Sequence, residues 1–261
     1  MAEQYKRYNP KRSADWNYGG KNWKLSRSKI DFFNECPRCF YIDNKCGVAR
    51  PKMPAFTLNV AVDALLKKEF DVHRIHKTAH PIMQKYGVDA VPFLHADIDA
   101  WRENFVGIQY RHEPTGMLIT GAVDDVWVNP AGELIVVDYK ATSKEGVIDS
   151  LDDSSWKEQY ERQLEVYQWL LRHKGFEVSS TGYFVYVNGQ KDREAFDGKL
   201  EFEVTLIAHK GSDSWVEPML LKIKKCLDSD KVPPPDKDCE FCAYRLAMQG
   251  ALAKAKNSTL F

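Results

Sequence analysis

The chain has 261 residues, of which 44% are hydrophobic and 28% charged, enough for one hydrophobic core in a single elaborated domain. Lys and Arg together number 37, as do Asp and Glu, which excludes a global basic field for nucleic acid. The longest stretch without a formal charge, residues 178–190, is shorter than the roughly 20 residues that span a bilayer. We therefore expect no membrane span and only local contacts with nucleic acid.

Residues 1–24 contain six Lys or Arg against two acidic residues, with aromatic side chains between them and no helical or strand period. We interpret this segment as a basic and aromatic N-terminal arm. Such an arm can contact phosphates and stack on unpaired bases, although a short solvated leader has the same composition. It has no apolar segment typical of a signal peptide, so we expect a cytoplasmic protein whose thiols are reduced.

Residues 25–261 alternate between helical and strand patterns and predict a single α/β domain. A short helix capped by Ser26 or Ser28 leads into Cys36. Helical periodicity predicts further helices over residues 56–70, 97–105, 158–173 and 213–227. Runs rich in β-branched and aromatic residues predict strands over residues 117–128, 134–140, 181–187 and 200–207.

The turn sequence Asn-Pro-Ala-Gly at residues 129–132 predicts a β-hairpin between the first two of these strands. A hairpin symmetric about Ala131 places Asp124 directly opposite Asp138. Like charges in that position destabilise a sheet unless something neutralises them. Carboxylate oxygens favour Mg²⁺ or Mn²⁺, so the pair predicts a divalent-metal site. A register slip of one residue would put Asp125 in the place of Asp124.

Lys140 follows Asp138 by two residues and therefore projects from the same face of the strand. An ammonium group beside a metal ion can act on the attacking water and stabilise the charge that grows on a phosphate. The three side chains thus predict metal-assisted phosphodiester hydrolysis. Solvated charges on an edge hairpin are the alternative, but the apolar run at residues 134–137 is typical of a buried strand, where charges need partners.

Three motifs occur in order: Gly-Ala-Val-Asp at residues 121–124, Val-Val-Asp-Tyr-Lys-Ala-Thr at 136–142, and a Gln-x-x-x-Tyr pair at 163–167. Together they resemble the PD-(D/E)xK nucleases, and specifically the RecB-like branch that includes CRISPR-associated exonucleases. The resemblance spans residues 26–242 and implies a restriction-endonuclease-like core, a mixed central β-sheet flanked by helices. It also implies that Asp124, Asp138 and the backbone carbonyl of Tyr139 bind the metal, and that Lys140 activates water.

The resemblance implies further site residues on two helices. Gln163 and Tyr167, which share a helix face, match a pair that lies near the active site and contacts DNA in this family. A buried amide such as Gln163 needs a hydrogen-bond partner, whereas Tyr167 taken alone could be a core aromatic. RecB-like enzymes usually carry a metal-binding His on the early helix, and this chain has Asp63 there. Asp63 either ligates the metal in its place or marks a changed or lost activity.

Two Cys-x-x-Cys pairs lie near opposite ends of the chain, Cys36 with Cys39 and Cys239 with Cys242. On spacing alone, four thiolates predict tetrahedral Zn²⁺. The resemblance implies an iron–sulfur cluster that joins the termini, and we favour that cluster narrowly over structural Zn²⁺. The family usually has one cluster cysteine near one end of the domain and three near the other, whereas this chain has two near each end. Cys46 is therefore a possible substitute ligand.

These features predict a metal-dependent DNA nuclease, an exonuclease on single-stranded or end-exposed DNA. The alternative is a catalytically degenerate nucleic-acid-binding or assembly subunit of a larger complex. A helicase or a CRISPR adaptation complex is the expected type of protein partner. No membrane partner is expected.

Overall fold

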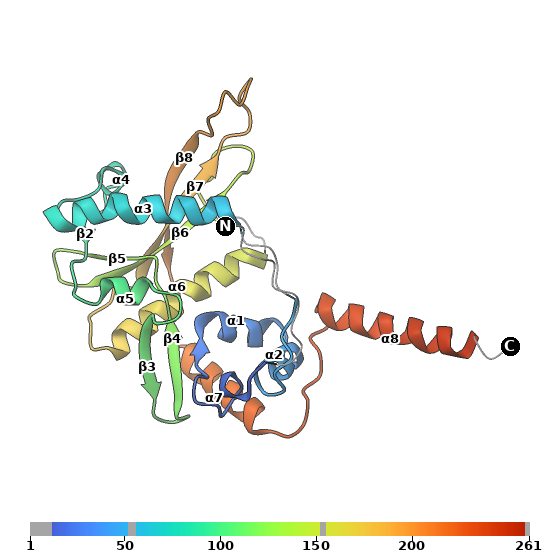
Figure 1. Ribbon diagram of the computed structural model, residues 1–261. Coiled ribbons are helices and arrows are strands. Elements are labelled where there is room, and N and C mark those ends of the chain that lie inside the picture. Colours follow the sequence, from blue (N-terminus) through green and yellow to red (C-terminus); the bar gives the residue numbers. More distant parts are fainter. Residues whose placement is uncertain (1–11, 52–55, 152–154, 259–261) are drawn as a thin grey trace. The chain divides into compact units, whose positions relative to one another are not determined.

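A computed structural model of the chain describes residues 12–51, 56–151 and 155–258 (Figure 1). The chain divides into two compact units. One unit is the continuous segment Pro54–Val216, and the other combines the two chain ends, Met1–Met53 and Glu217–Phe261. The single domain expected over residues 25–261 stays a prediction. It would require that the two units unfold in one cooperative transition.

A five-stranded mixed sheet forms the centre of the 54–216 unit. Its strands, in spatial order, are β2 (Val91–Pro92), β5 (Asp125–Val128), β6 (Leu134–Thr142), β7 (Thr181–Gly189) and β8 (Phe202–Lys210). β6 and β7 are parallel, and the other neighbours are antiparallel. The central strand β6 is buried continuously over residues 134–139, as its apolar run predicts. The predicted α/β fold with a mixed central sheet is therefore confirmed.

Two long helices, α3 (Thr57–His76) and α6 (Ser155–His173), contact side chains from opposite faces of β6. Odd-numbered residues of β6, including Val137, belong to a core cluster with Phe70 of α3. On the other face, Asp138 accepts a hydrogen bond from Gln163 of α6. Because strand side chains alternate between the faces, Asp138 and Lys140 project on the α6 side. Two short helices, α4 (Pro81–Lys85) and α5 (Ile98–Arg102), complete the helical part of this unit.

The predicted strand over residues 117–128 is wrong in its extent, because the chain is interrupted at residues 122–124. The first part is β4 (Met117–Gly121), which pairs with β3 (Ile108–His112) in an antiparallel hairpin that the sequence analysis did not predict. The interruption follows Gly121, where a Cβ atom would lie only 2.6 Å from the Tyr167 ring. Since α6 passes so close to the backbone here, no other residue fits without displacing that ring.

The predicted register of the β5–β6 hairpin is confirmed. Val126 lies opposite Val136, and Val128 lies opposite Leu134. If this register is extended by two residues beyond the Val126–Val136 pair, Asp124 lies opposite Asp138. The one-residue slip that would exchange Asp125 for Asp124 does not occur.

Asp125 instead anchors a buried ionic cluster. Its carboxylate is fully buried and accepts hydrogen bonds from Arg74 at 2.5 Å, from Arg102 at 2.9 Å and from the Tyr139 hydroxyl at 3.0 Å. Two guanidinium groups and a phenol offset the desolvation of the carboxylate, which would be prohibitive without partners. Removing one member of such a buried pair generally costs about 3–5 kcal/mol. Asp125 is therefore a structural residue.

The unit formed by the chain ends is largely helical. It contains the 3₁₀ turn η1 (Ala14–Trp16), the short strand β1 (Leu25–Ser26), and the helices α1 (Arg27–Glu35), α2 (Pro37–Asn44), α7 (Val216–Asp228) and α8 (Glu240–Ser258). The hydroxyl of Ser26 caps α1 by accepting from the backbone N–H of Lys29, which confirms the first of the two predicted caps. The helix α8 was not predicted. Among the described helices, none has the length and hydropathy needed to cross a bilayer.

Hydrogen bonds join the two chain ends within this unit. The Tyr41 hydroxyl donates to the carbonyl of Ser229, and the Arg38 guanidinium donates to the carbonyl of Pro233, both at 2.9 Å. The second half of the predicted N-terminal arm also packs here, since the indole of Trp23 donates to the side chain of Asn44. Residues 1–11 of the predicted arm lie outside the described residues.

Candidate active site and metal centre

Asp124 and Asp138 lie side by side on neighbouring chain segments, Asp138 within the central strand β6. Asp124 comes directly before β5, and its carboxylate accepts the backbone N–H of Tyr139 at 2.8 Å. Burial and the neighbouring Asp138 carboxylate raise the pKa of Asp124 to about 7. A cation bound between these groups would have to displace that proton, so its affinity would rise as the pH increases through 7.

Lys140 and Gln163 bind the same carboxylate. The ammonium group of Lys140 forms an ion pair with Asp138, whose side chain is fully buried. Gln163 donates through Nε2 to Asp138 at 2.6 Å and accepts through Oε1 from Lys140 at 3.2 Å. Its amide also donates to the Tyr167 hydroxyl at 3.2 Å. Four of the residues proposed from the sequence therefore form one hydrogen-bonded group, in which the amide of Gln163 has the partners that its burial demands.

Asp63 reaches the same region from α3. Burial and the nearby Asp124 carboxylate raise the pKa of Asp63. Lys67, one helical turn later, donates to Asp63 at 2.9 Å and lies 3.9 Å from Asp124. The sequence analysis missed Lys67, although its i,i+4 spacing from Asp63 is a recognisable signal for an ion pair. Lys67 and Lys140 thus supply positive charge to the cluster of three carboxylates.

The three carboxylates and the Tyr139 peptide offer the hard oxygen ligands that suit Mg²⁺ or Mn²⁺. The ring of Tyr139 turns to the opposite face, toward Asp125, so only its backbone remains beside Asp124. Among the described residues, the ligand oxygens of these three carboxylates do not all lie within 4.8 Å of one another, and the ammonium groups of Lys67 and Lys140 stand beside them. A divalent ion that binds here would replace those ammonium groups as the neutralising charge.

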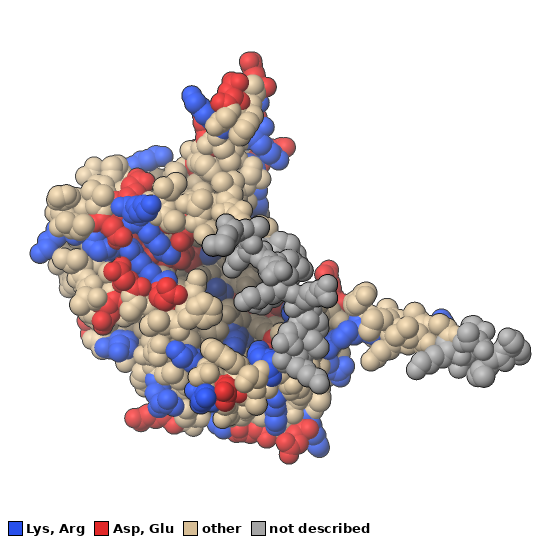
Figure 2. Space-filling model, viewed as in Figure 1, with Lys and Arg blue, Asp and Glu red and all other residues tan. Residues whose placement is uncertain are grey.

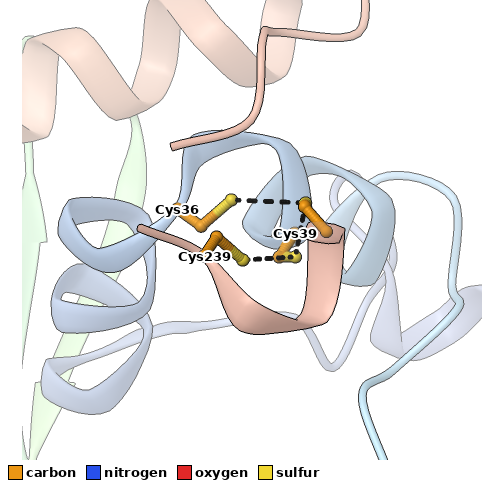
Figure 3. A group of neighbouring side chains, drawn as sticks. Cys36, Cys39 and Cys239 are labelled. Carbon is orange, nitrogen blue, oxygen red and sulfur yellow. Dashed lines mark hydrogen bonds between the residues drawn. The ribbon is translucent and has the colours of Figure 1, made fainter. Parts of the chain in front are cut away.

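The two Cys-x-x-Cys pairs form one cluster, in which Cys36 and Cys39 meet Cys239 and Cys242 (Figure 3). The Sγ–Sγ distances are 3.8 Å for Cys36 to Cys242, 3.7 Å for Cys39 to Cys239 and 3.5 Å for Cys39 to Cys242. Across the described ranges, this is the one group of His, Cys, Asp or Glu whose ligand atoms all lie within 4.8 Å of one another.

The surroundings of this cluster are positively charged. Arg50 approaches Cys239 at 3.4 Å, and Arg245 approaches Cys39 and Cys242 at 3.5 Å. Four thiolates around one divalent ion carry a net charge of −2, which guanidinium groups at these distances stabilise, although Arg50 also pairs with Glu35. Cys46 is exposed and does not belong to the cluster, so it does not serve as the substitute ligand considered from the sequence.

The profile of the PD-(D/E)XK nuclease superfamily matches residues 57–247 of the chain. No match is found among curated proteins. Two solved structures resemble the chain at low identity. One, named SSO0001, has a TM-score of 0.39 and 13% identity, over 85% of this chain and 84% of that one. The other, a candidate exonuclease from Eubacterium rectale, has a TM-score of 0.41 and 14% identity, over 94% of this chain and 93% of that one.

Proposed function

The chain belongs to the PD-(D/E)XK nuclease superfamily, and from this we propose that it is a Mg²⁺- or Mn²⁺-dependent deoxyribonuclease of the RecB-like branch. Its substrate is single-stranded or end-exposed DNA, and its mode is exonucleolytic. The observation that carries the proposal is the group formed by Asp138, Lys140 and Gln163 beside Asp124. A solvated edge hairpin would not bury a carboxylate and an ammonium group together.

Each residue of the group has a distinct role in this proposal. Asp63, Asp124, Asp138 and the backbone carbonyl of Tyr139 would hold the ion. The bound ion supplies Lewis-acid activation of the phosphate. The ammonium group of Lys140 orients the attacking water and stabilises the charge that develops on the phosphate. Gln163 is a positioning residue, because it binds both Lys140 and Asp138 and fixes their relative orientation.

A cleavage assay tests this function directly. With single- and double-stranded DNA labelled at the 5′ end, we expect cleavage in MgCl₂ or MnCl₂ and none in EDTA. Stepwise shortening would support an exonuclease, and internal fragments would indicate an endonuclease. A protein that is folded but cleaves neither DNA in the presence of MgCl₂ or MnCl₂ would contradict the proposal.

One observation favours the alternative of a degenerate binding or assembly subunit, acting with a helicase or a CRISPR adaptation complex. Lys67 already neutralises Asp63 and stands 3.9 Å from Asp124, so these carboxylates have a neutralising charge without a metal ion. In that case the chain would bind DNA in EDTA as well as in Mg²⁺, and it would cleave in neither.

We also propose that the four-cysteine site holds Zn²⁺, in place of the iron–sulfur cluster that the sequence analysis narrowly favoured. Thiolates around one Zn²⁺ at about 2.3 Å lie roughly 3.8 Å apart on the edges of a tetrahedron. The sulfur distances of 3.5–3.8 Å support that arrangement. An iron–sulfur cluster interposes several iron and sulfide ions and needs its thiolates much farther apart.

Metal analysis of the purified protein distinguishes Zn²⁺ from an iron–sulfur cluster at the four-cysteine site. We expect one zinc per chain, no iron and a colourless solution after aerobic or anaerobic purification. Substitution by Co²⁺ should give the intense visible bands of tetrahedral thiolate coordination. Brown protein with stoichiometric iron and acid-labile sulfide after anaerobic purification would contradict the assignment to zinc.

A further inference from the structure

A cleft of about 740 Å³ opens beside the candidate active site in the 54–216 unit. Its walls come from the start of α3, the end of β6 with the loop after it, the start of α6, and the β7–β8 turn. Tyr160 connects the cleft to the site, because it lines the cleft while its ring centroid lies 4.6 Å from Nζ of Lys140. The ring of Tyr160 therefore lies between the cleft and Lys140, and a molecule in the cleft would be one side chain away from this ammonium group.

The walls of the cleft are rich in aromatic side chains. These are Phe56, Trp156, Tyr160, Tyr186 and Phe202. Phe56 is 72% exposed and Trp156 is 60% exposed, so their ring faces are open to a ligand. Exposed rings gathered in one cleft are unusual on a protein surface and indicate a binding site.

The charged side chains along the cleft do not form a basic surface that would bind the phosphates of a nucleic acid. Lys144 and Lys157 are balanced by Glu145 and Asp149. Basic and acidic side chains are also interspersed over the face of the molecule shown in Figure 2. A ligand of this cleft is therefore recognised chiefly through flat apolar surface, which is the property of a nucleobase and not of the sugar–phosphate backbone.

We propose that this cleft binds unpaired nucleobases by stacking and thereby presents the adjoining phosphate to Lys140. The inference rests on the proposed nuclease function and specifies its substrate as single-stranded nucleic acid. Bases in a duplex are stacked on one another, so their faces are not available to Phe56 and Trp156. The volume lies within the range of pockets that enclose small organic ligands, which is sufficient for one or two bases.

Fluorescence anisotropy with labelled oligothymidylate tests the cleft independently of catalysis. Binding is measured in a Lys140→Met background with Ca²⁺, which prevents turnover. Phe56→Ala and Trp156→Ala should each weaken binding by about 5- to 100-fold, the range for loss of one stacked base. The slope of affinity against salt concentration should stay unchanged, because no phosphate contact is lost. The matched control is Phe105→Ala, a change of an 83% exposed ring outside the cleft, which should leave binding unchanged.

The outcomes separate this inference from the proposed function. If Phe56→Ala and Trp156→Ala both bind oligothymidylate as tightly as Phe105→Ala, the proposal of a stacking cleft is wrong. This holds even if the wild-type protein cleaves DNA. If the wild-type protein cleaves nothing but the two variants lose binding, the nuclease proposal fails and the stacking cleft stands. A duplex oligonucleotide should bind much more weakly than the single strand, and equal affinity for both would also overturn the inference.

Discussion

Replacing Lys140 by methionine should lower the rate of DNA cleavage by about 10²–10⁴-fold. Methionine keeps the unbranched apolar stem of the side chain and removes the ammonium group that pairs with Asp138. The rate is best measured in single-turnover experiments at saturating Mn²⁺, so that product release does not mask the chemical step. Lys191→Met is the matched control, because Lys191 is half-exposed and pairs only loosely with Glu145 at 3.4 Å.

Metal affinity distinguishes a catalytic role of Lys140 from a merely structural one. Removing a positive charge beside Asp138 should leave the affinity for Mn²⁺ unchanged or increase it. Calorimetric titration of the Lys140→Met variant measures this directly. Loss of metal binding in parallel with loss of activity would mean that Lys140 supports the site without acting on the substrate.

Replacing Cys239 by serine should lower the melting temperature of the unit formed by the chain ends by at least about 10 °C. Serine cannot complete a tetrathiolate site, so the variant loses the free energy of metal binding that stabilises this unit. A strong chelator should produce the same loss in the wild-type protein. Hydrogen exchange localises the effect, because the amides of α1, α2 and α8 should lose protection while those of β6 and β7 keep it.

Cys46→Ser is the matched control for this experiment. Cys46 is exposed and lies outside the cluster, so its replacement should leave the melting temperature within about 1 °C of the wild-type value. Equal stability of the two serine variants would refute a structural role of the metal.

The sequence was sufficient to predict the part of the site that lies on one hairpin. The turn at residues 129–132 sets the register, and the period of two then places Lys140 on the face of Asp138. The partner amide of Gln163 was predictable because a buried polar group must be satisfied. Helical periodicity placed Gln163 on a helix, and the motif order added its position beside Asp138, which no local rule could supply.

Contacts between distant segments were not predictable in the same way. Arg74 and Arg102 reach Asp125 across 51 and 23 residues, and no spacing in the sequence connects them. The end of β4 was missed because the run rich in β-branched and aromatic residues through residues 117–128 conceals the interruption after Gly121. β3 was missed because three of its five residues, in the sequence Ile-Gln-Tyr-Arg-His, are polar. The helix α8 was missed because its apolar side chains, including Leu246 and Leu252, are exposed instead of forming a buried stripe.

The order in which the cysteines are synthesised has a consequence for biogenesis. Cys39 leaves the ribosome 200 residues before Cys239, an interval on the order of 10–40 s at typical elongation rates. The whole sheet-containing unit is translated within that interval and can fold first. The early thiols must therefore stay reduced while they wait, and metal loading becomes the final maturation step. Ribosome-bound chains halted before Cys239 should already protect β6 from proteolysis while α1 is still cleaved.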